Sequence, residues 1–223
     1  MIELVVFDMA GTTVDEDNVV YKTVRAAINA AGYSFTQEQV QADGAGKEKS
    51  QAIRDVLALD GQPHSDDEVA TIFADFKQRL AVAYRELDVR EQPGTSDCFA
   101  ALHQRSIRVV LNTGYDRPTA EGLIKKIGWT VGQDIDALVT ASDVENARPE
   151  PDMIYKAMEL LGITDSKAVA KVGDSQIDIT EGQRANCGMT FGVTTGAQSE
   201  SHLAKAGPTA IIDNLMQLLD HLQ

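Results

Sequence analysis

Apolar runs of strand length alternate with segments of helical length over most of the chain, and this alternation restricts the possible folds most strongly. The first run, residues 2–7, is hydrophobic at nearly every position, which is typical of a central parallel strand covered on both faces. Similar runs follow at 108–112, 137–140 and 168–172. Segments of helical length lie at 96–105, 117–127, 151–162 and 177–186. The sequence therefore predicts an open α/β fold built on a parallel sheet.

Residues 14–88 interrupt this alternation. They contain helical patterns at 17–31, 36–42, 48–57 and 66–87, and no convincing strand. The segment 89–94, which ends in Pro-Gly, is typical of a linker that returns to the sheet. We therefore predict an α/β core of residues 1–13 and 89–223 and an all-helical cap of residues 14–88. Ligands of open α/β sheets bind at the carboxyl ends of strands, so an insert that leaves the sheet there would cover the binding site.

Composition and charge exclude several classes of protein. The chain has 223 residues, of which 43% are hydrophobic and 24% charged, enough to bury a sizeable core. Its net charge of −14 repels phosphate backbones and argues against a nucleic-acid binder. No apolar run approaches the ~18 residues of a membrane span, and residues 1–7 do not resemble a signal peptide. Cys98 and Cys187 do not make a disulfide framework, so we expect a reducing, cytoplasmic setting. Together with the charge and the hydropathy, this predicts a cytoplasmic enzyme that binds neither nucleic acid nor membranes.

Polar side chains follow the predicted strands at the edge where a ligand would bind. They are Asp8 after the first run, Thr113-Gly114 after the second, Arg148-Pro149 beyond the third and Gly173-Asp174 after the fourth. Asp174 and Asp178 are four residues apart at the start of a helix, so they share a face and can hold a hard cation beside Asp8. The Thr113 hydroxyl and the fixed charge of Arg148 would complete a cradle for a phosphoryl group.

In this order the motifs resemble those of the haloacid dehalogenase superfamily of hydrolases. The four motifs are Asp8-Met-Ala-Gly-Thr-Thr, Thr113-Gly114, Arg148-Pro149 and Gly173-Asp-Ser-Gln-Ile-Asp178. The resemblance covers residues 1–13 and 89–195 and implies a Rossmann-like core with the helical insert as its cap. A closer likeness, to the phosphonoacetaldehyde hydrolase (phosphonatase) branch, rests on three features. They are the Asp-Met-Ala-Gly-Thr-Thr sequence, Thr113-Gly114-Tyr115 followed by Arg117, and Arg rather than Lys in the third motif.

The resemblance implies hydrolysis through an aspartyl phosphate formed on Asp8. It implies that Mg²⁺ is held by Asp8, the Ala10 carbonyl and Asp174, with a partial role for Asp178. Thr113, Arg148 and backbone N–H groups of the first loop would stabilise the transferred oxygens. The residues expected to contact the substrate are Gly11, Thr12, Gly114, Lys47 and Lys49. We expect a small phosphonate or phosphate metabolite as substrate, with phosphonoacetaldehyde the leading candidate. Related enzymes include monomers and cap-paired dimers, which leaves a homodimer open.

Position 10 separates this chain from the usual phosphatases of the superfamily. Those enzymes carry a second Asp two residues after the nucleophile, as general acid to the leaving alkoxide, whereas this chain has Ala10. Losing a positioned general acid typically costs ~10²–10⁴ in rate. Phosphonatases need no such acid because a cap lysine forms a Schiff base with the substrate aldehyde, and Lys49 matches that lysine. We expect Lys47 to lower the pKa of Lys49 by like-charge repulsion and Glu48 to oppose this effect.

Two alternatives remain open. Phosphonatases have a methionine four residues before the lysine and a histidine three residues after it, where this chain has Ala45 and Ala52. Lys49 is equally suited to binding a substrate anion, as a basic residue of the same loop does in phosphoglycolate phosphatases and β-phosphoglucomutase. The chain would then be a phosphomonoesterase. The other alternative is a protein that binds a phosphorylated ligand without turnover.

Overall fold

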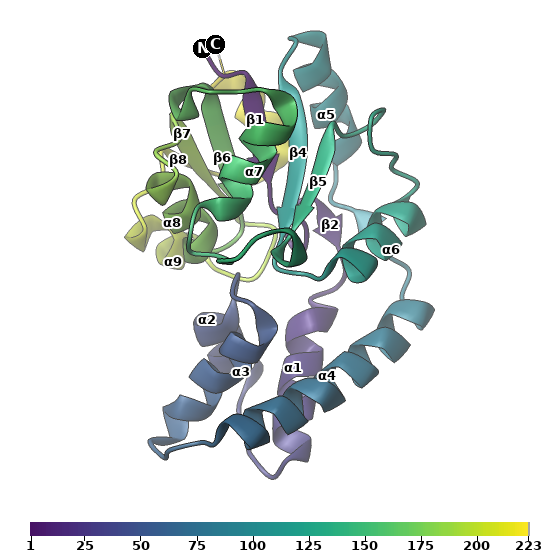
Figure 1. The fold of residues 1–223 in the computed structure, drawn as a ribbon, viewed down its shortest axis with the longest axis vertical. Helices are drawn as coiled ribbons and strands as arrows, with labels where there is room; N and C mark the ends of the chain where they lie inside the picture. Colours follow the sequence, from purple (N-terminus) through teal and green to yellow (C-terminus); the bar gives the residue numbers. More distant parts are fainter. Residues whose placement is uncertain (223) are drawn as a thin grey trace.

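Six parallel strands form the central sheet, seen in a computed structural model that describes residues 1–222 (Figure 1). In order across the sheet, the strands are β5 (Ala137–Thr140), β4 (Arg108–Thr113), β1 (Leu4–Phe7), β6 (Val169–Gly173), β7 (Met189–Val193) and β8 (Ala210–Ile212). Every neighbouring pair is parallel, so the carboxyl ends of all six strands lie at one edge. The predicted α/β class is confirmed.

Helices cover both faces of the sheet, which explains why β1 is apolar throughout. Successive side chains of a strand point to opposite faces. Leu4 and Val6 belong to the same hydrophobic cluster as the buried side of α7 (Asp152–Leu161). Val5 and Phe7 face the other way, where the Phe7 ring lies 5.3 Å from the ring of Phe99 in α5 (Thr95–Gln104). The central strand is therefore buried on both faces, as its sequence predicted.

The four apolar runs of the sequence are the four adjacent strands β5, β4, β1 and β6. The four core helices predicted between them are also confirmed as α5, α6 (Arg117–Ile127), α7 and α8 (Gln176–Arg184). β7, β8 and the short helix α9 (Glu200–Lys205) were not predicted from the sequence. Thr190 and Gly192 break the apolar pattern of β7, and β8 is only three residues long, so neither strand has a clear periodicity.

Four helices lie together beneath the sheet in Figure 1, where the sequence predicted a helical insert. They are α1 (Val19–Ala30), α2 (Gln37–Gly44), α3 (Lys49–Leu57) and α4 (Asp66–Glu86). α4 begins where the Ser65 hydroxyl accepts a hydrogen bond from the backbone N–H of Glu68, and the acidic side chains of its first turn favour the positive end of the helix dipole. Within residues 1–222, no helix is both long and apolar enough to cross a membrane.

Two short strands join the sheet to these helices. β2 (Val14–Asp15) pairs antiparallel with β3 (Arg90–Glu91), so the outgoing and returning chains lie side by side. The expectation that residues 14–88 contain no strand is therefore wrong at Val14–Asp15, because a two-residue strand leaves no periodic signal. The exact division at residues 14 and 88 stays a prediction.

Glu16 lies buried at this connection, between β2 and α1, with 2% of its surface exposed. Its Oε2 accepts a hydrogen bond from the backbone N–H of Val20 at 3.1 Å, in the first turn of α1. Burial raises the pKa of Glu16 to about 8, although the N–H bond and the charge of Lys49 act in the opposite direction. The carboxyl group is therefore protonated in the folded protein near neutral pH.

We predict that Glu16→Gln stabilises the protein more at pH 8 than at pH 5. The unfolded chain loses the Glu16 proton near its usual pKa of ~4.3, so the folded state binds more protons between this value and about 8. The free energy of unfolding of the wild type should consequently fall as pH rises through this window, by about 2–4 kcal/mol relative to the variant. Urea unfolding at both pH values measures the difference. The exposed Glu145→Gln should show none, and an equal effect of Glu16→Gln at both pH values would refute the prediction.

Candidate active site

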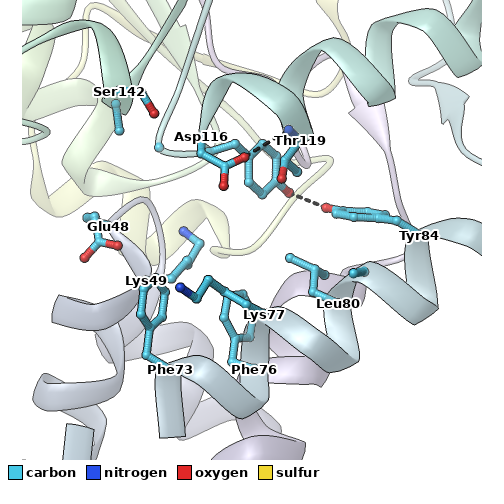
Figure 2. A pocket seen from close by; sticks show the side chains of 14 residues that line it. Glu48, Lys49, Phe73, Phe76, Lys77, Leu80, Tyr84, Asp116, Thr119 and Ser142 are labelled. Atoms are coloured by element: carbon cyan, nitrogen blue, oxygen red, sulfur yellow. Dashed lines mark hydrogen bonds between the residues drawn. The ribbon is translucent and has the colours of Figure 1, made fainter. Parts of the chain in front are cut away.

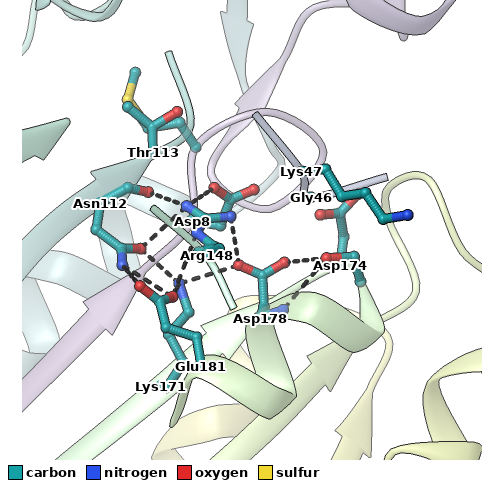
Figure 3. Close-up of polar contacts among 12 residues, drawn as sticks. Asp8, Gly46, Lys47, Asn112, Thr113, Arg148, Lys171, Asp174, Asp178 and Glu181 are labelled. Carbon is teal, nitrogen blue, oxygen red and sulfur yellow. Dashed lines mark hydrogen bonds and ion pairs between the residues drawn. The ribbon is translucent and has the colours of Figure 1, made fainter. Parts of the chain in front are cut away.

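Four chain segments bring polar side chains together at the carboxyl edge of the sheet (Figure 3). Asp8 follows β1, Thr113 ends β4, and Asp174 follows β6. Arg148 comes from the loop before α7, and Asp178 from the first turn of α8. All five are buried. The convergence predicted from the ends of the strands is therefore present.

Arg148 is the central contact of this group. Its Nη2 donates to Asp8 Oδ1 at 2.6 Å and to the backbone oxygen of Asn112 at 2.9 Å. Its Nη1 donates to Asp178 Oδ1 at 2.7 Å. The guanidinium thus fixes one oxygen of Asp8, and the other oxygen receives no hydrogen bond from residues 1–222. Asp8 can therefore present an unpaired carboxylate oxygen to a substrate.

The turn after β1 determines which backbone groups face the site. The N–H groups of Gly11 and Thr12 donate to the oxygens of Val14 and Met9 within the turn. They are therefore not available to a phosphoryl group in this geometry, and their expected contact with the substrate stays a prediction. Gly11 itself is required, since it has φ +79° and a Cβ there would lie 2.5 Å from Asp174 Oδ2.

Three buried carboxylates form a site suited to a divalent cation. Each of Asp8, Asp174 and Asp178 offers an oxygen, and these oxygens lie within 4.8 Å of one another. Burial raises the pKa of Asp174 well above its usual range, and the charges of Asp8 and Asp178 add to this effect. Burial also opposes ionisation of Asp178, but Arg148 and Lys171 outweigh it and lower the pKa of Asp178. A hard cation would relieve the repulsion at Asp174.

Two further buried side chains, Lys171 and Glu181, support this site and were not identified from the sequence. Lys171 Nζ lies 3.1 Å from Asp178 Oδ1 and 3.2 Å from Glu181 Oε2, and it donates to Asn112 Oδ1 at 2.5 Å. Asn112 in turn donates to Glu181 Oε1 at 2.9 Å. Lys171 and Glu181 are fully buried. The only sequence signal for them was a lysine inside an otherwise apolar strand run.

Charge counting favours a cation at this edge. The buried group contains four carboxylates, Asp8, Asp174, Asp178 and Glu181, and two cations, Arg148 and Lys171. With these six groups ionised and the neighbouring Lys49 neutral, two negative charges remain unbalanced among buried side chains. This excess matches the charge of one Mg²⁺, and carboxylate oxygens are its preferred protein ligands.

The loop before α3 brings the layer formed by α1, α2, α3 and α4, which we call the helical layer, against the core. Gly46 has φ +74°, and a Cβ at this position would lie 2.4 Å from Ser175 Oγ. The backbone N–H of Gly46 donates to the hydroxyl of the buried Tyr21 at 3.0 Å. The backbone oxygen of Lys47 lies close to Gly114. A side chain at position 46 would therefore separate the loop from the core.

Lys49, the first residue of α3, is buried beneath this loop. Its Nζ donates to the backbone oxygen of Lys47 at 2.6 Å and lies 5.4 Å from the centre of the Tyr21 ring. Burial lowers the pKa of Lys49, and Arg148 lowers it further, whereas Asp8 raises it. Lys49 and Asp8 line the same small cavity of about 20 Å³, together with Ala10, Thr113 and Gly114. Burial in this position therefore favours the neutral form of the Lys49 amine more than water would.

Lys47 has a different environment from the expected one. Its side chain forms an ion pair with Asp55 of α3. The like-charge effect on Lys49 comes from Arg148 instead of Lys47. Glu48 accepts hydrogen bonds from the backbone N–H groups of Ser50 and Gln51 and so caps α3. Contact between Lys47 and a substrate stays a prediction.

The sequence matches the description "haloacid dehalogenase-like hydrolase" over residues 2–186, a range that includes all four motifs and the buried site. The chain belongs to this hydrolase family. Membership argues against the alternative of a protein that binds a ligand without turnover. The buried acidic edge of the sheet is therefore the candidate active site of a haloacid dehalogenase-like hydrolase.

Relatives with a more specific name cover most of the chain. The phosphonoacetaldehyde hydrolase of Bacillus cereus (strain B4264) is 32% identical over 210 residues, which are 88% of this chain and 77% of that protein. A bifunctional phosphonoacetaldehyde hydrolase/aminoethylphosphonate transaminase of Clostridioides difficile is 31% identical over 199 residues, but the chain spans only 30% of its length. The solved structure of a phosphonoacetaldehyde hydrolase-like protein from Oleispira antarctica is 25% identical, with a TM-score of 0.83 over 99% of this chain and 91% of that one. The resemblance found in the motifs is confirmed.

We predict that Mg²⁺ raises the melting temperature of the wild type but not of Asp174→Asn. The substitution removes one carboxylate from the candidate metal site and also removes a repulsive buried charge. Without Mg²⁺, the variant should therefore be at least as stable as the wild type. Thermal unfolding with and without Mg²⁺ measures both effects. The exposed Asp67→Asn should keep the response to Mg²⁺, and an unchanged response in Asp174→Asn would contradict the assignment.

We predict that Lys171→Met lowers the free energy of unfolding by about 3–5 kcal/mol, because Asp178 and Glu181 lose a buried partner. Urea unfolding at neutral pH measures the change. The exposed Lys167→Met is the matched control and should stay within about 0.5 kcal/mol. A loss of less than 1 kcal/mol at Lys171 would show that the network does not depend on this charge.

Proposed function

We propose that the protein hydrolyses the carbon–phosphorus bond of a small phosphonate that carries a carbonyl group, as in phosphonoacetaldehyde. One observation carries the proposal: Lys49, a buried lysine whose pKa is lowered, lines the same small cavity as Asp8. Position 10, which also lines this cavity, has no carboxyl group that could protonate an alkoxide. The names of the relatives, which are phosphonoacetaldehyde hydrolases at 31–32% identity, support the same substrate class.

In the proposed reaction, Lys49 activates the carbon side of the substrate. The amine adds to the carbonyl carbon and, with one proton taken up on nitrogen, water leaves to give a protonated imine. When the C–P bond breaks, its electron pair moves to the carbon and the imine becomes an enamine. The imine nitrogen thus serves as the electron acceptor, so no acid at position 10 is required. Protonation of the enamine carbon and hydrolysis of the imine release acetaldehyde and regenerate Lys49.

Asp8 acts on the phosphorus side. Its unpaired carboxylate oxygen attacks phosphorus as the C–P bond breaks and forms an aspartyl phosphate. Arg148 and Thr113 line the same cavity as Asp8, and in this proposal their side chains stabilise the equatorial oxygens. The backbone N–H groups of Met9 and Ala10, unlike those of Gly11 and Thr12, have no backbone partner in the turn and can add to this stabilisation. A second water then hydrolyses the acyl phosphate and releases phosphate.

Asp8, Asp174, Asp178 and the Ala10 carbonyl are the residues that would hold Mg²⁺. When bound, the ion would offset the charge of the phosphonate and of the clustered carboxylates. Other residues of the chain hold these carboxylates in position. Arg148 keeps Asp8 and Asp178 in fixed positions, and the Ala197 N–H orients Asp174 by donating to its Oδ2 at 2.5 Å.

The helical layer excludes water from this chemistry. The loop at Gly46 rests against Ser175 and the chain near Gly114, which closes the cavity from one side. Because an imine hydrolyses in water, a closed cavity protects it until the C–P bond has broken. Opening and closing of the helical layer would then admit the substrate and release acetaldehyde.

We predict that Lys49→Arg lowers the release of acetaldehyde and phosphate from phosphonoacetaldehyde with Mg²⁺ by at least about 10³-fold. Arginine keeps the positive charge but cannot form the imine. The matched control is Lys22→Arg, an exposed position on α1, which should keep the wild-type rate. Both products, measured together, should appear in equal amounts.

The alternative, a phosphomonoesterase that uses Lys49 only to bind an anion, predicts the opposite pattern. Lys49→Arg would then retain activity, and the wild type would release phosphate from phosphoglycolate but no acetaldehyde from phosphonoacetaldehyde. Either result would overturn the proposed C–P cleavage.

A further inference from the structure

A second, larger cavity lies beside the small one that contains Asp8. Figure 2 shows the side chains that line the larger cavity. Its volume is about 440 Å³, compared with about 20 Å³ for the inner cavity. Lys49, Gly114 and Tyr115 line both of them, so the two spaces meet beside Lys49. We call the larger space the outer chamber. It begins where the carbonyl carbon of the substrate would sit.

The outer chamber has an apolar floor formed by one face of α4. Phe73, Phe76, Leu80 and Tyr84 line it from this helix, as Figure 2 shows. These positions follow helical spacing, so they share one side of α4. The Tyr84 hydroxyl donates to the Tyr115 hydroxyl at 2.8 Å and needs no ligand. The floor is therefore suited to hydrocarbon and not to a polar group.

The charged side chains around the outer chamber lie at its rim and interact with other groups of the protein. Lys77 Nζ lies 4.7 Å from the centre of the Phe73 ring, a cation–π contact at an exposed position. Asp116 accepts a hydrogen bond from the backbone N–H of Thr119 and caps α6, and Glu48 caps α3. Positive and negative side chains both occur at the rim, so neither sign of ligand charge is favoured there.

From this geometry we infer that the natural substrate is larger than phosphonoacetaldehyde and carries an apolar group beyond its carbonyl carbon. The inference rests on the proposed function and names the substrate class: β-ketophosphonates whose substituent is an aromatic or branched hydrocarbon group. Water would convert R–CO–CH₂–PO₃²⁻ into the methyl ketone R–CO–CH₃ and hydrogen phosphate. The phosphonate occupies the inner cavity at Asp8, the carbonyl carbon meets Lys49, and the group R lies on Phe73, Phe76 and Leu80.

Binding of two phosphonates without a carbonyl group tests the outer chamber apart from the chemistry. Methylphosphonate has no group that could extend into the outer chamber, whereas the phenyl group of 3-phenylpropylphosphonate would reach the floor formed by α4. Isothermal titration with Mg²⁺ present should show that the phenylpropyl compound binds about ten- to a hundredfold more tightly, because it buries a phenyl-sized apolar surface. Equal affinities, or no binding of the phenylpropyl compound, would overturn the inference.

Two tryptophan substitutions on α4 locate the effect. Ala81 lines the outer chamber, whereas Val82 is exposed on the same helix and does not line it. Ala81→Trp should reduce the ratio of the two affinities to less than about threefold, and Val82→Trp should leave the ratio unchanged. A ratio that Ala81→Trp does not alter would place the phenyl group outside the chamber and contradict the inference.

The two proposals fail in different ways. If Lys49→Arg keeps its activity while phenylpropylphosphonate still binds more tightly, the C–P chemistry is wrong and the outer chamber remains a binding site for apolar phosphonates. If Lys49→Arg is inactive but the affinities are equal, the chemistry stands and the inference about substrate size is wrong. A final comparison uses 2-oxo-3-phenylpropylphosphonate, which the wild type should hydrolyse with a higher kcat/KM than phosphonoacetaldehyde.

Discussion

The buried contacts of Arg148 determine the rest of the site. One guanidinium joins Asp8, which follows β1, the backbone of β4 at Asn112 and Asp178 of α8. Buried charges are unfavourable unless they are paired, so a shift of any one of these segments would leave a buried charge without its partner. Lys171 and Glu181 extend the same network behind the site. The excess of carboxylates that remains is what makes the edge suited to a divalent cation.

The helical layer buries one further charged side chain, Lys49, at the same edge of the sheet. Lys49 is enclosed by the Gly46 loop and by Tyr21, and this enclosure lowers its pKa. In the proposed reaction, the core provides fixed charge around phosphorus and the helices provide the amine. Ala10 fits this proposal, because a lysine that accepted electrons through an imine would replace the acid that an ester needs. The apolar face of α4 extends the same space away from phosphorus.

Much of the core site could be predicted because parallel strands carry their terminal residues to one edge. Asp8, Thr113 and Asp174 follow directly from that rule, and four adjacent strands, β5, β4, β1 and β6, were recognised by their apolar runs. Other features depend on tertiary contacts that no local pattern encodes. These include the ion pairs of Lys171, the pairing of Lys47 with Asp55, the internal hydrogen bonds of Gly11 and Thr12, and the outer chamber. A homodimer and a cytoplasmic location stay predictions.

Trapping the covalent intermediate tests the central claim, that Lys49 forms an imine beside Asp8. The protein is incubated with phosphonoacetaldehyde and Mg²⁺, reduced with borohydride, digested and analysed by peptide mass spectrometry. The account predicts one ethyl group on the peptide that contains Lys49, formed by reduction of the product imine, and loss of activity in proportion to the modification. Full activity after reduction, or an adduct confined to other lysines, would contradict it.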